Sequence, residues 1–325
     1  MRAALLRWYR RCRRDMPWRR NVSPYRTWVS EIMLQQTTVA AVTPKYRTFL
    51  RQFPDVRTLA AAPEDAVLKQ WAGLGYYTRA RNLRRAAIEI VGRHGGEFPS
   101  EFDEVLALPG IGRYTAGAIL SIAFEKKFPV VDGNVIRVFS RLFGLRGKPK
   151  DPSFVKEIWS RAENLVAKDR PGDWNQALME LGATVCTPDG PACGACPVSG
   201  SCVAFKKNLQ DRLPIPDERR APVPVKWTCL WIVRDGKLLI WRRSAKERLL
   251  KNLWGLPEAG RIPAVVGRRI ATVSHTITHH SLTVELHEAA LQAGARLPSE
   301  AKWIPRAKAK DYLVSSLWLK LLEMR

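Results

Sequence analysis

The chain has 325 residues, more than the roughly 250–300 at which a single hydrophobic core usually stops growing, so two domains are expected. A hydrophobic content of 46% with 12 Trp, 10 Phe and 7 Tyr excludes disorder as the main state, and no apolar run approaches the roughly 18–20 residues of a membrane span. The net charge of +24 points to nucleic acid or an anionic membrane surface as the partner. Because the basic residues are spread along the chain, nucleic acid is favoured.

The first residues are rich in arginine, but they do not have the pattern of a secretory signal. They lack the apolar core of about 7–15 residues found in secretory signals. Composition leaves a transit peptide open, although Trp8 and Tyr9 already resemble core residues.

Up to about residue 205 the pattern predicts helices. Apolar residues recur at helical spacing in three stretches. These are Leu68 and Trp71; Leu83, Ala87, Ile88 and Val91; and Val155, Ile158 and Trp159. Proline and glycine punctuate the stretches, as they do at helix ends. We therefore predict one helical domain over residues 1–205.

Between residues 206 and 226 the periodicity stops. Four prolines dominate this segment, which predicts an extended, semi-rigid linker. Short β-type runs follow at 227–233, 237–241 and 283–286, and Asp235-Gly236 is a hairpin signal between the first two. Residues 227–325 are predicted to form an α+β domain.

Four of the six cysteines fall within one short loop that glycines and prolines turn. They are Cys186, Cys193, Cys196 and Cys202. Four thiolates suit tetrahedral zinc or an iron–sulfur cluster, because both are soft-ligand sites. Zinc sites more often pair two C-x2-C units and only one is present, so the spacing favours a cluster and leaves zinc as the alternative.

Residues 108–117 place Gly110 and Gly112 in a tight turn directly before a helix rich in small residues. Backbone N–H groups at such a helix start form an anion site, and in a basic protein the anion is a DNA phosphate. The alternative is a corner between two helices that binds nothing.

Two carboxylates stand out by their surroundings. Asp132 follows an apolar pair and precedes a helical stretch, where it would cap the helix. Glu31 lies among Trp28, Ile32 and Met33, where it is either a first-turn glutamate of a helix capped by Ser30 or Thr27, or a buried carboxyl whose pKa burial raises.

Together these motifs resemble the endonuclease III-like helix-hairpin-helix DNA glycosylases. The cysteine spacing resembles the loop that holds one 4Fe-4S cluster in that superfamily, and residues 108–117 resemble its hairpin over all ten positions. Residues 17–19, 28–37, 71–77 and 174–182 resemble the adenine-specific, MutY-like branch. The resemblance covers most of residues 8–205 and implies that the hairpin binds phosphate and that the loop holds the cluster.

The resemblance implies an enzyme that flips adenine mispaired with 8-oxoguanine or guanine out of duplex DNA and hydrolyses its N-glycosidic bond. Glu31 matches the general acid, and Asp132 matches the carboxylate that stabilises the oxocarbenium-like sugar cation. A carboxylate at a helix start stays ionised, as this role requires. Tyr114 stands where bifunctional relatives carry the lysine that forms a Schiff base, so the resemblance implies a monofunctional glycosylase in which Tyr114 assists Asp132.

Further positions are carried over by the same resemblance. The adenine-pocket positions are Trp18, Arg19, Asn134 and Glu180, and Gln36 and Tyr76 match side chains that wedge beside the mismatch.

The second domain resembles the Nudix-like domain by which the adenine-specific branch reads 8-oxoguanine, at residues 241–243 and 253–258. No Asp or Glu lies between Glu258 and Glu285, so a magnesium site is missing and recognition without hydrolysis is implied. The segment 274–279 departs from the family's Phe-Ser-His, with Ile277, Thr278 and His279 in those places. Thr278 and His279 are the expected lesion contacts, and residues 260–269 leave little room for the usual helix.

Three alternatives remain. An endonuclease III-like pyrimidine glycosylase with lyase activity conflicts with Tyr114, a non-catalytic DNA-binding protein conflicts with Glu31 and Asp132, and a nucleotide-pool hydrolase lacks its magnesium carboxylates. We expect a monomer that acts on duplex DNA containing 8-oxoguanine:adenine mispairs, in a bacterial cytoplasm at the nucleoid rather than in a nucleus, with no membrane partner.

Overall fold

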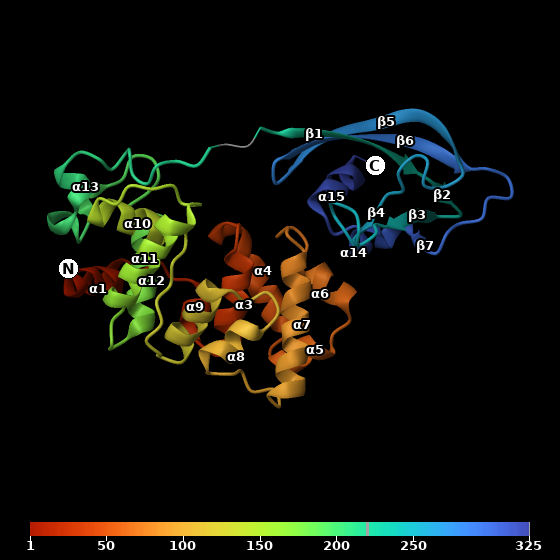
Figure 1. The fold of residues 1–325 in the computed structure, drawn as a ribbon. Helices are drawn as coiled ribbons and strands as arrows, with labels where there is room; N and C mark the ends of the chain where they lie inside the picture. Colours follow the sequence, from red (N-terminus) through yellow and green to blue (C-terminus); the bar gives the residue numbers. More distant parts are fainter. Residues whose placement is uncertain (219–220, 325) are drawn as a thin grey trace. The chain divides into compact units, whose positions relative to one another are not determined.

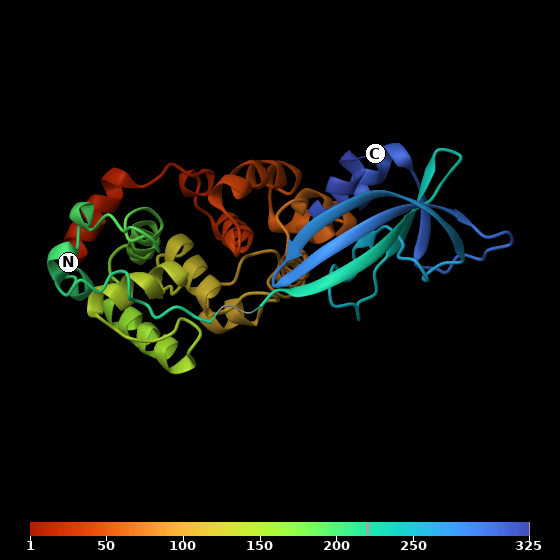
Figure 2. The same ribbon diagram turned by 90° about the horizontal axis from the view of Figure 1, so that it is seen from above.

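The computed structural model describes residues 1–218 and 221–324, and the chain divides into two compact units (Figures 1 and 2). Unit 1 comprises residues 1–61 and 82–218, and unit 2 comprises residues 62–81 together with the chain after 218. Residues 219 and 220 of the predicted linker, and residue 325, lie outside the described residues.

Unit 1 is helical, as the sequence predicts. Its helices are α1 (Arg2–Cys12), α2 (Pro17–Arg20), α3 (Pro24–Leu34), α4 (Val39–Gln52), α5 (Val56–Ala61), most of α7 (Thr78–Arg93), α8 (Phe102–Ala107), α9 (Arg113–Ala123), α10 (Gly133–Phe143), α11 (Pro152–Leu165), α12 (Pro171–Thr184) and α13 (Val203–Lys206). One predicted core position is wrong: Ile88 is 44% exposed, while Leu83, Ala87 and Ile90 form the buried face of α7.

Local capping explains where the site-bearing helices begin. Ser23 accepts a hydrogen bond from the Arg26 N–H, and Pro24 follows it at the first helical position of α3. Glu31 therefore lies in the last turn of α3, and the interpretation of Glu31 as a first-turn glutamate is wrong. Asp132 caps α10 by accepting from the Val135 N–H, which confirms its predicted place at a helix start.

The core of unit 1 brings α9, α10 and α12 together. Apolar side chains of α10 and α12, among them Phe139 and Trp174, form its buried centre. Gly117 lets α9 approach the segment before α10 closely, since a Cβ there would lie 2.3 Å from the Pro129 carbonyl oxygen. This contact sets the spacing between the start of α9 and the start of α10.

Unit 2 contains two sheets and short helices, so the predicted α+β character is confirmed. Its strands are β1 (Val223–Trp231), β2 (Val233–Arg234), β3 (Lys237–Arg242), β4 (Trp254–Gly255), β5 (Ala264–Ile277), β6 (His280–Leu291) and β7 (Ala301–Pro305). Its helices are α6 (Glu64–Trp71), α14 (Ala309–Tyr312) and α15 (Ser316–Glu323).

The first sheet has the order β1-β6-β5, with β1 parallel and β5 antiparallel to β6. The second sheet has the order β2-β3-β4, and β7 also pairs with β3. Asp235 and Gly236 both have positive φ and connect β2 to β3, which confirms the predicted hairpin. Trp318 of α15 stacks on Trp227 of β1 in the buried core of unit 2.

Two segments differ from the expected strand pattern. The predicted strand 283–286 is the middle of the longer β6, and β5 was not predicted. Residues 260–269 contain the start of β5 and no helix. No helix in the described part of the chain is long and apolar enough to cross a bilayer.

Candidate active site

Glu31 is a buried carboxyl, 7% exposed, in the last turn of α3. Burial raises its pKa from 4.5 to about 7. The Tyr114 hydroxyl opposes this rise by donating a 2.6 Å hydrogen bond to Oε2, the charge of Asp132 adds to it, and the charge of Arg19 lowers it slightly. Glu31 therefore exists in both protonation states near neutral pH, as a general acid must.

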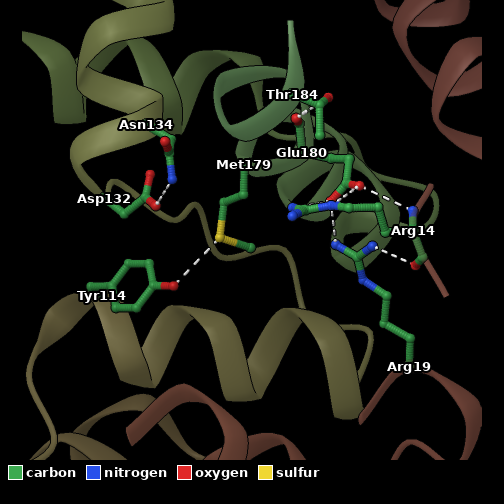
Figure 3. A network of polar contacts seen from close by, with 8 residues as sticks. All are labelled: Arg14, Arg19, Tyr114, Asp132, Asn134, Met179, Glu180 and Thr184. Carbon is green, nitrogen blue, oxygen red and sulfur yellow. Dashed lines mark hydrogen bonds and ion pairs between the residues drawn. The ribbon is translucent and has the colours of Figure 1, made fainter. Parts of the chain in front are cut away.

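Tyr114 lies in the first turn of α9, directly after the Gly110–Gly112 turn. Burial and the neighbouring charges of Glu31 and Asp132 raise its pKa well above 10, so the phenol keeps its proton. Figure 3 shows the hydroxyl pointing toward Met179, whose sulfur lies 3.4 Å away. The hydroxyl therefore has two acceptors, the Glu31 carboxyl at 2.6 Å and the Met179 sulfur at 3.4 Å, and Asp132 acts on Tyr114 through its charge.

Asp132 accepts two hydrogen bonds that hold its carboxylate. The Val135 N–H donates to Oδ1 at 2.7 Å and the Asn134 side chain donates to Oδ2 at 2.8 Å (Figure 3). Burial raises the pKa of Asp132 above its usual value, and these two donors act in the opposite direction. Burial outweighs the two donors, so folding favours the protonated form of Asp132 more than water does, and the hydrogen bonds at the helix start limit that rise.

A second charged group, formed by Arg14, Arg19 and Glu180, lies on the other side of Met179 (Figure 3). Glu180 of α12 is 1% exposed and pairs with both arginines. Burial opposes its ionisation, but hydrogen bonds from Arg14 and Arg19 outweigh burial and lower the pKa of Glu180 to about 2. Trp18, which directly precedes Arg19 in the chain, is buried and packs edge-on against Tyr46.

Arg137 connects Asn134 to the cysteine loop. Its guanidinium donates to Asn134 Oδ1 at 2.8 Å and to the Cys186 carbonyl at 2.8 Å. Arg141, 3% exposed, donates to the Thr187 and Pro188 carbonyls and approaches Cys186 Sγ at 3.4 Å. The loop after α12 is thereby tied to the helix that Asp132 begins.

The four loop cysteines line one small cavity together with Arg141. Two 3-10 turns, η1 (Cys193–Ala195) and η2 (Ser199–Ser201), position Cys193, Cys196 and Cys202, and Cys186 follows the end of α12. Among residues 1–218 and 221–324, no three His, Cys, Asp or Glu side chains stand close enough to hold one metal ion. Four thiolates from one loop are the donor set that a tetrahedral zinc ion or a 4Fe-4S cluster takes, so the residues present fit such a group.

The hairpin before α9 has the backbone of an anion site. Gly110 adopts a φ of +80°, and a Cβ there would lie 2.7 Å from the Asn82 Cβ. Gly112 is the N-cap of α9 and offers no side-chain cap. The first-turn N–H groups therefore keep no side-chain acceptor, which is the arrangement that binds phosphate.

The remaining predicted residues lie in loops. Gln36 is exposed, with a φ of +54°, just after α3 in unit 1. Within unit 2, Tyr76 is 45% exposed, and Thr278 and His279 form the turn between β5 and β6. Tyr76 and Thr278 line the same cavity of about 490 Å³, whereas His279 is not among its lining residues and His280 is.

Sequence patterns did not point to Arg14, Met179, Arg137 or Arg141. Arginines are so frequent in this chain that none stands out, and only the folded contacts show which of them face a carboxylate or a carbonyl. The sole available signal was the position of Met179, directly before Glu180.

These features define a base-excision glycosylase of the helix-hairpin-helix superfamily. The family model of the HhH-GPD superfamily of base excision DNA repair proteins matches residues 29–164. A solved thermostable thymine-DNA glycosylase is 32% identical with a TM-score of 0.57, covering 63% of this chain and 94% of its own. An endonuclease III–DNA covalent intermediate, at 22% identity and a TM-score of 0.55, covers 64% of this chain and 94% of its own and shares the fold.

The relatives narrow the class further. The adenine DNA glycosylase of Homo sapiens is 32% identical, covering 99% of this chain and 73% of that protein. The adenine DNA glycosylase of Buchnera aphidicola (strain APS) is 35% identical, covering 78% of this chain and 73% of that protein. The chain belongs to the adenine DNA glycosylase family.

Proposed function

We propose that this protein is a monofunctional glycosylase that excises adenine opposite 8-oxoguanine or guanine in duplex DNA. The observation that carries the proposal is the pairing of a buried glutamic acid, Glu31, which accepts a hydrogen bond from Tyr114, with the capped carboxylate of Asp132, whose charge acts on both groups. Two carboxyls in different surroundings supply one acid and one anion, the set that N-glycoside hydrolysis requires.

In this mechanism Glu31 gives its proton to a ring nitrogen of the flipped adenine as the N-glycosidic bond breaks. Both bonding electrons leave with the base, and Asp132 stabilises the resulting sugar cation. Water then supplies a hydroxyl to C1′, and its second proton returns to a carboxylate. Tyr114 has no amine, so no Schiff base forms and the DNA strand stays intact.

Recognition of the opposite base is assigned to unit 2. The cavity of about 490 Å³ that Tyr76 and Thr278 line offers an exposed aromatic ring and a hydroxyl to a base. We propose that residues 227–325, together with residues 223–226 of β1, form a Nudix-like reader joined through the rest of the 206–226 linker to the glycosylase domain over 1–205, and that Gln36 contacts the DNA beside the mismatch.

Cys186, Cys193, Cys196 and Cys202 are proposed to hold one 4Fe-4S cluster. A bound cluster would join the four thiolates and so hold the loop in one conformation. Arg137 and Arg141, both in α10, would then connect the loop to that helix through their hydrogen bonds to the loop carbonyls. These carbonyls belong to Cys186, Thr187 and Pro188.

The protein is proposed to work as a monomer on duplex DNA, in the compartment that holds the DNA, whether bacterial nucleoid or nucleus. The hairpin at Gly110 and Gly112 would contact phosphates without regard to sequence.

The decisive experiment incubates the protein with a duplex containing adenine opposite 8-oxoguanine, with and without alkali. We expect adenine release, and strand breakage only after alkali. Breakage without alkali would refute the monofunctional assignment, and absence of release would refute the function.

Variants assign the roles. E31Q and D132N should each abolish release while duplex binding persists, and E104Q, at an exposed glutamate of α8, should leave release unchanged. Retained release in E31Q or D132N would remove the role given to that residue. Metal analysis should find four iron atoms per chain, and zinc alone would overturn the cluster.

A further inference from the structure

Glu180 is surrounded by hydrogen-bond donors from two arginines. Oε1 accepts from the Arg14 N–H at 3.0 Å and from Arg14 Nε at 2.8 Å. Oε2 accepts from Arg14 Nη2 at 3.1 Å and from Arg19 Nη2 at 2.9 Å. Arg14 alone therefore supplies three of these four hydrogen bonds.

A carboxylate offers about four lone-pair sites, and here all four are used within the protein. Glu180 is also the most buried of the three groups, with side-chain exposures of 1% for Glu180, 12% for Arg19 and 40% for Arg14. A buried carboxylate without hydrogen-bond donors would take up a proton or move toward solvent. Arg14, the most exposed of the three residues, thus stabilises the ionised form of Glu180 and fixes the orientation of the Glu180 carboxylate.

Arg19 depends on the same arrangement. Its Nη1 donates to the Arg14 carbonyl at 3.0 Å, its Nη2 donates to Glu180, and its guanidinium lies 5.5 Å from the Tyr9 ring centroid. Arg14 therefore touches Arg19 twice, directly through its carbonyl and indirectly through the shared carboxylate. The charge of Arg19 in turn acts on Glu31.

We propose that Arg14 is a positioning residue for the base pocket: it fixes Glu180, and through Glu180 it holds the Arg19 guanidinium toward the catalytic side. The inference rests on the proposed function, since its readout is adenine release. Arg14 itself need not touch the base. Its side chain acts by fixing the two groups behind it.

The test compares single-turnover adenine release by the whole protein and by R14Q, R14K and R11Q. Arg11 is an exposed arginine at the end of α1 and serves as the matched control. We expect R14Q to release adenine roughly 10- to 100-fold more slowly, because misplaced catalytic groups cost about that much, with duplex affinity unchanged. R14K keeps the charge but loses the two-pronged contact, so its rate should lie between those of R14Q and the unchanged protein.

Two readouts separate positioning from a general structural role. In an E180Q background, R14Q should slow release less than twofold further, because its partner is already lost. The alkaline limb of the rate should move to higher pH in R14Q, because Arg19 then lowers the pKa of Glu31 less. Iron content and the thermal midpoint verify that each variant is folded.

Release by R14Q within twofold of the unchanged protein would overturn the inference. So would a full, independent R14Q effect in the E180Q background. An unchanged protein that releases no adenine would instead refute the proposed function, which keeps the two failures apart. If R14Q does not fold, R14K against E180Q decides the same question.

Discussion

Replacing Glu31 by glutamine should stabilise the protein at pH 8 even though it removes the proposed general acid. Folding raises the pKa of Glu31 from 4.5 to about 7, so ionising this carboxyl costs the folded state. A raised pKa means that the contribution to stability is complete below about pH 4.5 and is lost as pH rises through 7. At about 1.4 kcal/mol per pH unit, the cost of the charge above pH 7 is about 3 kcal/mol.

Glutamine avoids this cost and keeps the local contacts, because its amide oxygen can still accept the Tyr114 hydrogen bond. The advantage of E31Q over the unchanged protein should grow by about 2.5 kcal/mol between pH 5 and pH 8. For a domain of this size such a change moves the thermal midpoint by roughly 5 °C.

Calorimetry of the full protein at both pH values, with E104Q as the control, measures this difference. A stability gain that is equal at pH 5 and pH 8 would refute the reasoning. So would a loss of stability at pH 8, since either result means that the Glu31 charge is not penalised in the folded state.

Three further predictions follow from other contacts. Adenine release should fall about tenfold per pH unit above pH 7 as Glu31 loses its proton, and a rate that stays flat to pH 9 would contradict the acid role. G182A should slow release roughly tenfold, because the new Cβ would lie 2.5 Å from the Asn134 Cβ and displace the Asn134 amide that donates to Asp132. G92A, whose new Cβ would meet open space, is the control, and equal rates for the two variants would refute the argument. Affinity for undamaged duplex should drop steeply with salt, as a net charge of +24 implies, and an affinity indifferent to salt would give the charge another purpose.

The sequence predicts those parts of the fold that repeat a local pattern. Helical spacing at residues 155–159 marks α11, and Asp235-Gly236 marks the β2–β3 turn, because each signal lies within a few residues. The strand β5 was missed because its first half is exposed, with Val265 at 61% and Val266 at 45%, and two arginines follow. An exposed strand shows no alternation of buried and polar residues, and only its pairing with β6 reveals it.

The residues proposed as catalytic were predicted from motifs, not from their contacts. Glu31 and Tyr114 are 83 positions apart, and no pattern along the chain shows that their side chains meet. Nor does the sequence show that Arg14 faces Glu180, 166 positions away, among so many other arginines. Burial did give one correct signal, because a lone Glu among Trp, Ile and Met is the residue whose pKa rises.

Because Gly117 has no side chain, substitutions at position 117 and at position 114 have different consequences for the evolution of this site. The close approach of α9 to the Pro129 carbonyl fixes the frame that carries Tyr114 and Asp132, and any larger residue at 117 would disturb both at once. A substitution at position 114, by contrast, changes the side chain that contacts Glu31 and leaves the frame in place. Single substitutions at the start of α9 can therefore change the chemistry of the site without moving its backbone. Position 117, in contrast, must stay glycine for that backbone to keep its place.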